Sequence, residues 1–233
     1  MELAKDRLDV ALVSDRIEVS AFYRGQAGVE LEEVLPLQSG WDQHRHTLAG
    51  SVLKVNIRTD RELQGRSAIA EILAVREGLD EPRGYIDPDG TVLTRVPPGH
   101  VGIEQILVRL AVPDPERTLA FWTDTFGFER ADEHTARCGL TLIRPEEGPA
   151  ADRVGIGTSR GWNYLTVQVQ DCDAEHAAVL ARGGEEVVGP RTLGDVARFS
   201  FVCDPDGTLL EISERRSLTG RPLRRDPRPP TRL

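Results

Sequence analysis

The sequence lacks the features of a membrane-spanning, secreted or nucleic-acid-binding protein. None of its apolar runs approaches the roughly 18 residues that cross a bilayer. Its first residues lack the basic and apolar regions of a secretory signal, so we expect a cytoplasmic protein. A formal net charge of −9 argues against a nucleic-acid partner, which would require clustered lysines and arginines.

Cysteines and the motifs of nucleotide or serine-hydrolase chemistry are scarce as well. The three cysteines, Cys138, Cys172 and Cys203, are odd in number and irregularly spaced. This pattern argues against a disulfide framework or a zinc knuckle and favours buried, reduced thiols. The sequence also has no phosphate-binding loop, dinucleotide fingerprint or nucleophile elbow, which excludes nucleotide and serine-hydrolase chemistry.

What the chain does have is an internal repeat. The motif Asp-Pro-Asp-Gly-Thr occurs at Asp87 and again at Asp204, and the segment from Val13 to Glu30 resembles that from Val112 to Glu129. Repeats of this kind indicate duplicated units. We therefore predict a first domain at 7–97 whose second part is truncated, a second domain at 100–214, and an exposed basic, proline-rich tail at 215–233.

The two halves share one order of elements. In the second half, alternation predicts strands at 105–112, 164–169, 196–202 and 209–213, while capping and composition predict helices at 114–126 and 172–184. In the first half, the same patterns predict strands at 8–13, 32–37, 44–48 and 51–56 and a helix at 15–26. The helix at 172–184 has no counterpart there, which leaves 69–76 as a strand or a remnant helix.

The order, spacing and duplication of these motifs resemble the glyoxalase, bleomycin-resistance and extradiol dioxygenase superfamily, also called vicinal oxygen chelate proteins. The helix of each half carries Ala-Phe followed by an aromatic residue and ends in Gly-x-Glu, and each half closes with Asp-Pro-Asp-Gly. The resemblance implies an α+β fold with two domains of paired βαβββ modules. Each domain would form a curved mixed sheet with helices outside and a cup-shaped cavity inside.

Alternation in the second half separates an apolar from a polar strand face. The polar faces carry Gln105, Arg109, Tyr164, Thr166, Gln168 and Glu211. We predict that helices cover the apolar faces and that Arg109, Tyr164 and Glu211 face one cavity, where they would contact a ligand. The alternative is a plain sheet surface that faces solvent.

Many members of this superfamily hold a divalent ion with His or Gln on the first strand of each module and Glu on the last. The resemblance implies that the same positions would hold an ion here. Carried over to the second half, these positions are Leu107, Tyr164 and Glu211, and only Glu211 is a usual ligand. We therefore expect no cofactor. If iron, manganese, zinc or nickel were bound, Glu211 with Gln105 would be the ligands.

The first half departs from the family pattern too. The counterpart of Leu107 is Leu8, and the counterpart of Glu211 is Thr94. Lys54, one of only two lysines, lies in an apolar strand near the position where some relatives keep Glu, so it is a candidate ligand contact; the alternative is an edge lysine facing water. His44 shares a strand face with His46. The two could hold a metal as a His-x-His pair or be ordinary strand residues, and His44 is also a candidate ligand contact.

Three functions remain open. The first is binding of a small organic molecule with metal-independent acid-base chemistry of the lyase or isomerase type, in which Glu211 is the acid or base, Tyr164 donates a hydrogen bond and Arg109 orients an anionic group. The second is sequestration of a drug-like molecule without turnover. The third is a metal-dependent extradiol-type dioxygenase. The expected partner is a small molecule, with no nucleic acid and no membrane, and a monomer and a homodimer both fit the sequence.

Overall fold

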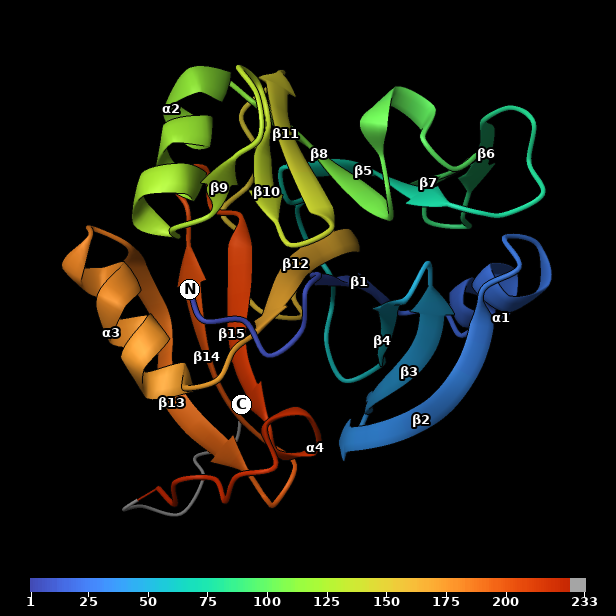
Figure 1. The fold of residues 1–233 in the computed structure, drawn as a ribbon. Helices are drawn as coiled ribbons and strands as arrows, with labels where there is room; N and C mark the ends of the chain where they lie inside the picture. Colours follow the sequence, from blue (N-terminus) through green and yellow to red (C-terminus); the bar gives the residue numbers. More distant parts are fainter. Residues whose placement is uncertain (227–233) are drawn as a thin grey trace.

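The computed structural model describes residues 1–226, so residues 227–233 of the predicted tail lie outside the described residues. The chain folds into four modules that follow one another (Figure 1). The first comprises β1 (Asp9–Ser14), α1 (Glu18–Gly25), β2 (Glu30–Gln38), β3 (Trp41–Leu48) and β4 (Ser51–Arg58). The second comprises β5 (Ile69–Val75), β6 (Arg83–Ile86) and β7 (Val92–Val96), with no helix between its strands.

The third and fourth modules are complete. After a short turn of helix, η1 (His100–Gly102), the third comprises β8 (Ile106–Val112), α2 (Pro115–Ala120) continued by η2 (Phe121–Thr125), β9 (Glu129–Arg130), β10 (Ala136–Cys138) and β11 (Thr141–Glu147). The fourth comprises β12 (Gly161–Gln168), α3 (Cys172–Ala181), β13 (Glu185–Leu193), β14 (Ala197–Cys203) and β15 (Leu209–Arg215), and α4 (Arg216–Thr219) follows it.

The predicted elements are present, with ends shifted by a few residues. Segment 69–76 forms a strand, and the helix expected after it in a complete module is absent. Asp114 caps α2 by accepting from the Arg117 N–H, and Asp171 caps α3 in the same way. The edge strand β13 was not predicted, because Gly189 and Pro190 interrupt its pattern at an irregular part of its pairing with β14.

Two mixed sheets contain all of these strands. The eight-stranded sheet has the order β13-β14-β15-β12-β1-β4-β3-β2, and the seven-stranded sheet has the order β6-β7-β5-β8-β11-β10-β9. Paired βαβββ-type modules in curved mixed sheets were predicted, and this fold class is confirmed.

The modules that share a sheet differ from those predicted. The family resemblance implied that each half closes its own sheet, but each sheet takes one module from each half. The antiparallel pair β1–β12 joins the first module to the fourth, and β5–β8 joins the second to the third. Alternation does not reveal this, because both arrangements pair the same strand edges and bury the same faces. The boundary near residues 97–100 stays a prediction about domains.

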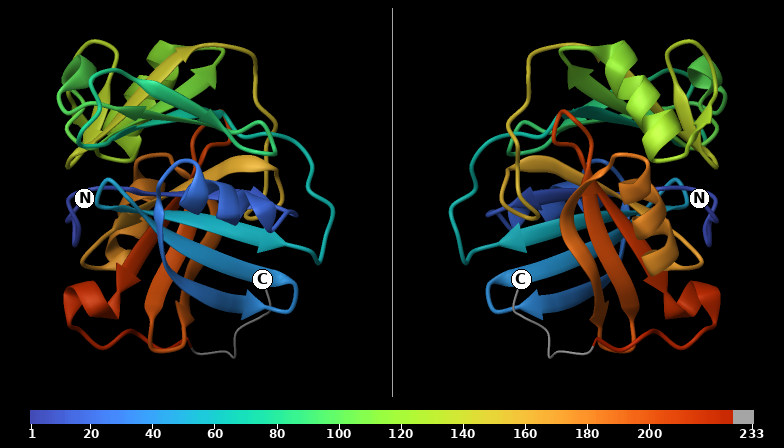
Figure 2. Two further views of the ribbon diagram at one scale, coloured as in Figure 1. Left: turned by 90° about the vertical axis from the view of Figure 1, so that its right-hand side faces the viewer. Right: turned by 90° about the vertical axis from the view of Figure 1, so that its left-hand side faces the viewer.

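The two sheets lie in layers, with the seven-stranded sheet above the eight-stranded sheet in Figure 1, and both views of Figure 2 show the same stacking. Helix α3 packs on β13, β14 and β15, and α2 packs on β8 and β11. The predicted apolar faces of the second half are fully buried. Much of their cover comes from the facing sheet rather than from helices, which corrects the expectation that helices alone cover them.

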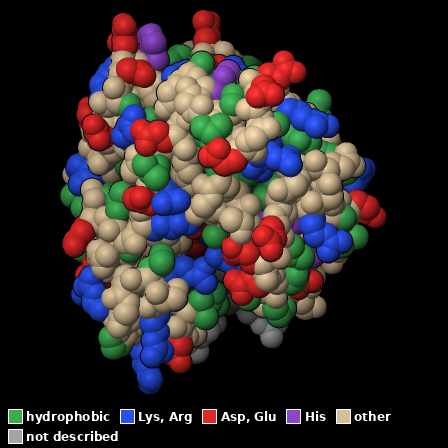
Figure 3. Space-filling view, turned by 45° about the vertical axis from the view of Figure 1, so that its right-hand side comes forward, with side chains coloured by type: hydrophobic (Ala, Val, Ile, Leu, Met, Phe, Trp, Pro, Cys, Tyr) green, Lys and Arg blue, Asp and Glu red, His purple; other side chains and the backbone are tan. Residues whose placement is uncertain are grey.

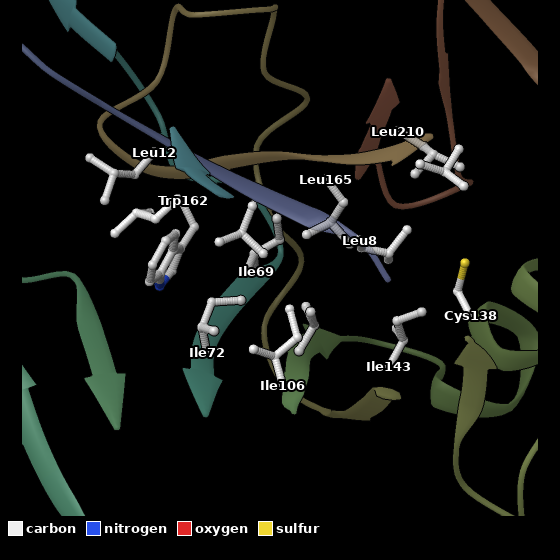
Figure 4. Packing of buried hydrophobic residues seen from close by; sticks show 14 of the residues in the cluster. Leu8, Leu12, Ile69, Ile72, Ile106, Cys138, Ile143, Trp162, Leu165 and Leu210 are labelled. Carbon is white, nitrogen blue, oxygen red and sulfur yellow. The ribbon is translucent and has the colours of Figure 1, made fainter. Parts of the chain in front are cut away.

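The main hydrophobic core fills the space between the sheets. Leu8 and Leu165 from the eight-stranded sheet lie against Ile69, Ile72 and Ile106 from the other (Figure 4). The three cysteines are buried and free, as predicted. Because this core occupies the inner faces of both sheets, the other face of the eight-stranded sheet is left for a ligand.

The surface shows no segregation of charge on the face drawn in Figure 3, where acidic and basic side chains are interspersed. Within residues 1–226, no helix is long and apolar enough to cross a membrane. The described part of the basic tail lies along the fourth module, where Asp226 accepts hydrogen bonds from Arg198 and from the Thr192 N–H.

The repeated Asp-Pro-Asp-Gly motif has a structural role. Tyr23 on α1 donates its hydroxyl to Asp87 at 3.2 Å, and Trp122 on η2 donates its indole N–H to Asp204 at 2.9 Å. The second oxygen of each aspartate accepts backbone N–H groups two and four residues further along the chain. Burial raises the pKa of Asp204 to about 6. The motif therefore ties the two modules of each half together.

Replacing Trp122 with Phe should lower the free energy of unfolding by about 1–3 kcal/mol, because one oxygen of the buried Asp204 loses its partner. Chemical denaturation of Trp122→Phe, Asp204→Asn and the double variant measures the coupling between the two groups. We expect the double variant to lose clearly less than the two single losses together. Strictly additive losses would contradict this role.

Candidate functional site

A cavity of about 130 Å³ lies on the concave face of the eight-stranded sheet. The first module lines it through β2, β3 and β4, and the fourth lines it through β12, β13, β14 and β15. The lining residues are Leu35, Leu37, Gln38, Trp41, Gln43, Arg45, Lys54, Ile156, Tyr164, Gln168, Leu193, Val196, Ala197, Phe199, Phe201, Glu211, Ser213 and Arg215. The cavity therefore exists only because the two halves share a sheet.

Strand alternation selects the side chains that face the cavity. On β12, Tyr164 and Gln168 point to the concave side, whereas Leu165 and Val167 enter the core between the sheets. On β15, Glu211 lies on the concave side and Ile212 in the core. The predicted faces of these two strands are thus brought together as expected.

Two buried side chains, Lys54 and Thr166, and the partly buried Glu211 form a compact polar cluster beside the cavity. The Lys54 ammonium on β4 donates to Glu211 Oε2 on β15 at 2.6 Å and to Thr166 Oγ1 on β12 at 2.7 Å. Thr166 Oγ1 in turn donates to Glu211 Oε2 at 2.6 Å. Lys54 comes from the first half and the other two from the second, so the cluster spans the joint between the halves.

A small residue makes room for this cluster. Ala11 on β1 pairs with Lys54 on one side and with Tyr164 on the other. Its methyl group lets the ammonium lie 5.3 Å from the centre of the Tyr164 ring. Lys54 was predicted as a candidate contact, and the structure places it in the cavity wall rather than at a water-facing edge.

The protonation equilibria of two cavity residues are perturbed. Burial lowers the pKa of Lys54, and the neighbouring Glu211 carboxylate opposes that effect. Burial, assisted by Glu211, raises the pKa of Tyr164, so the phenol stays neutral and can donate a hydrogen bond. Perturbed groups that converge on a cleft are typical of functional sites.

Several cavity residues were missed by the sequence analysis. Strand β3 presents Trp41, Gln43 and Arg45 on its concave face, and the Arg45 guanidinium donates to Gln43 Oε1 at 3.1 Å. Alternation along 41–48 would have separated these residues from the histidines between them. Arg215 was missed because the last strand was predicted to end at Ser213, whereas it continues to Arg215.

Two predicted contacts lie elsewhere. Arg109 on β8 belongs to the seven-stranded sheet, where it forms ion pairs with Glu71 and Glu146. The prediction that it shares a cavity with Tyr164 and Glu211 is therefore wrong. Gln105 is buried just before β8, and its amide donates to Ala49 O at 2.6 Å and to Ser51 Oγ at 2.8 Å. It holds the two sheets together and does not line the cavity.

The histidine pair also lies outside the cavity. His44 Nδ1 and His46 Nε2 lie 2.8 Å and 3.1 Å from the hydroxyl oxygen of Ser20 on α1. The two histidines share one strand face, as predicted, but it is the face that α1 covers. Burial lowers the pKa of both. Neither is placed to contact a molecule on the concave side.

The residues present do not fit a divalent metal ion of the family type. The first and last strands of the paired modules are β1, β12, β4 and β15, and Lys54 and Glu211 occupy the last strands. An ammonium ion cannot be a metal ligand. The nearby Asp9 already accepts from Lys5 at 2.6 Å and from the Val52 N–H at 2.9 Å. Among residues 1–226, no three His, Cys, Asp or Glu side chains are grouped to hold a metal.

The Lys54–Glu211 pair should be strongly coupled. Replacing one partner, as in Glu211→Leu or Lys54→Met, leaves a buried charge uncompensated and should cost roughly 3 kcal/mol of unfolding free energy. The double variant should recover most of that loss. The exposed pair Arg153–Glu185 is the matched control, and Arg153→Met should cost less than about 1 kcal/mol. Chemical denaturation measures each free energy of unfolding. A double variant that loses as much as the two single variants together would refute the coupling.

Comparison with known proteins agrees with this description. Residues 99–212 match the family model described as Glyoxalase/Bleomycin resistance protein/Dioxygenase superfamily. No curated protein matches the sequence.

Solved structures resemble most of the chain. Glyoxalase I from Zea mays superposes with a TM-score of 0.69 at 13% sequence identity, over 89% of this chain and 92% of the maize chain. A variant of the same maize enzyme gives a TM-score of 0.68 at 12% identity, over 89% and 92% of the two chains. At such low identity the similarity establishes the fold alone. Through residues 99–212, the chain belongs to the glyoxalase, bleomycin-resistance and dioxygenase superfamily.

Proposed function

We propose that this protein binds a small organic molecule in the concave cavity and acts on it by acid-base chemistry without a metal. The observation that carries the proposal is the largely buried Lys54–Thr166–Glu211 cluster at the wall of a largely apolar cavity. A few placed polar groups in an apolar cleft are typical of small-molecule sites. Perturbed lysine and tyrosine residues in the same cleft favour chemistry in addition to binding.

Each member of the site has a definite role in this proposal. Both hydrogen bonds to Glu211 end on Oε2, and among the described residues Oε1 has no hydrogen-bond partner. Oε1 is therefore the atom that would accept or return a proton of the ligand. The Lys54 ammonium and the neutral Tyr164 phenol would stabilise negative charge that develops on a ligand oxygen.

Sequestration without turnover is the second candidate. One observation favours it, because the Lys54 ammonium is already bonded to two partners within the protein. A cluster that satisfies itself can serve as a rigid cavity wall and need not exchange protons. Binding experiments do not separate the two candidates, whereas product analysis does.

Binding in the cavity can be tested by filling it. Ser213 is buried and lines the cavity, so Ser213→Phe should abolish the thermal stabilisation that single-ring compounds give the original protein. At a hundred times its Kd, a ligand should stabilise by about 2.7 kcal/mol. Thr94→Phe, on a strand of the other sheet, is the matched control and should keep the stabilisation.

Retained stabilisation in Ser213→Phe would place the binding site elsewhere. For compounds that bind, incubation followed by product analysis tests turnover. A product formed by the original protein and lost in Lys54→Met supports acid-base chemistry, whereas binding without any product supports sequestration.

Protein purified without added metal should contain far less than one equivalent of iron, manganese, zinc or nickel, because Lys54 occupies one of the ligand positions. Elemental analysis measures the content, and melting with and without a chelator measures its effect on stability. We expect no change in melting temperature. Stoichiometric metal that disappears in Glu211→Gln would restore the dioxygenase hypothesis.

A further inference from the structure

The cavity carries an excess of positive charge, in contrast to the net charge of −9 of the whole chain. Its lining contains the cations Arg45, Lys54 and Arg215, and Glu211 is its only carboxylate. Glu211 is paired with Lys54 at 2.6 Å. The two arginines are therefore not balanced by an acidic residue of the cavity wall.

The two arginines differ in their partners. Arg45 lies 2.9 Å from Glu33 on β2, a carboxylate that is 47% exposed. Arg215 has no ion-pair partner among residues 1–226, and its buried Nε has no hydrogen-bond partner there either. Burial and the nearby Arg45 lower the pKa of Arg215. An anion between these two guanidinium groups would relieve their repulsion and supply the missing acceptor.

The rest of the cavity is apolar. Phe199 and Phe201 stand edge to face on β14, with ring centres 6.1 Å apart. Leu193 and Val196, at the tip of the β13–β14 hairpin, are 47% and 46% exposed. Exposed apolar side chains that gather beside a cleft are typical of ligand-binding grooves. The cavity volume of about 130 Å³ is close to that of a cavity that holds benzene, about 150 Å³.

We infer that the ligand is a small organic carboxylate with one apolar ring, whose carboxylate is held by Arg215 and Arg45 and whose ring lies on Phe199 and Phe201. The inference rests on the proposed function, because it assumes that the cavity is the binding site. The planar fork of a guanidinium group matches the two oxygens of a carboxylate. The carboxylate would leave Lys54 and Glu211 free to act on the ring or its substituent.

Isothermal titration at neutral pH with a matched series of probes tests the charge preference. Benzoate, benzamide and benzamidine share a ring and differ in charge. We expect benzoate to bind at least about tenfold more tightly than benzamide, and benzamidine to bind most weakly. Inorganic phosphate should compete poorly, because it lacks the ring. Equal competition by phosphate would show that the site recognises an anion alone and would overturn the apolar part of the inference.

Variants test whether Arg215 causes the preference for benzoate over benzamide. Arg215→Met should reduce benzoate affinity by about tenfold, to that of benzamide, while benzamide affinity changes less than about twofold. Arg109→Met, which removes an arginine of the other sheet, should leave both affinities unchanged. Because the probe series needs no variant, it decides the charge preference even if Arg215→Met fails to fold.

The outcomes separate this inference from the proposed function. If benzamide binds as tightly as benzoate, and Ser213→Phe abolishes both, the cavity is the site but its preference for anions is wrong. If benzoate is preferred but Arg215→Met keeps that preference, the assignment of the anion to Arg215 is overturned. If no probe binds, the inference fails, and the Ser213→Phe comparison with screened compounds decides the proposed function independently.

Discussion

The antiparallel pairing of β1 with β12 is the constraint on which the candidate site depends. It joins the first module to the fourth, and its register sets Ala11 opposite Tyr164. Because β4 and β15 flank this pair, Lys54 from the first half reaches Glu211 from the second. Had each half closed its own sheet, the lysine and the carboxylate would lie in different sheets. The cavity and its charge cluster are thus products of how the modules pair.

The four modules are connected alternately by two kinds of contact. Sheet pairing joins the first module to the fourth and the second to the third, whereas the bonds Tyr23–Asp87 and Trp122–Asp204 join the modules within each half. The repeated sequence motif therefore marks a structural link that the two halves share. This explains why the most obvious repeat in the sequence contributes no residue to the cavity lining.

The family resemblance implied the fold class, and local alternation predicted much of the site, because a strand face is a property of a single segment. Tyr164, Gln168 and Glu211 were placed on one side correctly. Arg109 was misplaced because alternation assigns a face to a strand but does not say which sheet contains that strand. Arg45 was missed because it lies between His44 and His46 on the opposite face of its strand. Arg215 was missed because the last strand was predicted to end at Ser213, two residues before its observed end. Strand partners depend on contacts between distant segments, and a single sequence does not reveal them.

The cations of this cavity also bear on why the family metal does not suit it. Two unit charges 4 Å apart interact by about 4 kcal/mol at an effective dielectric constant of 20, and a divalent ion doubles that repulsion toward each neighbouring cation. A metal beside Lys54 would meet the ammonium directly and would also meet the guanidinium groups of Arg45 and Arg215. A negatively charged organic ligand has the opposite effect, because it is attracted by all three. The three basic side chains that line the cavity therefore disfavour a bound divalent ion and favour a negatively charged ligand.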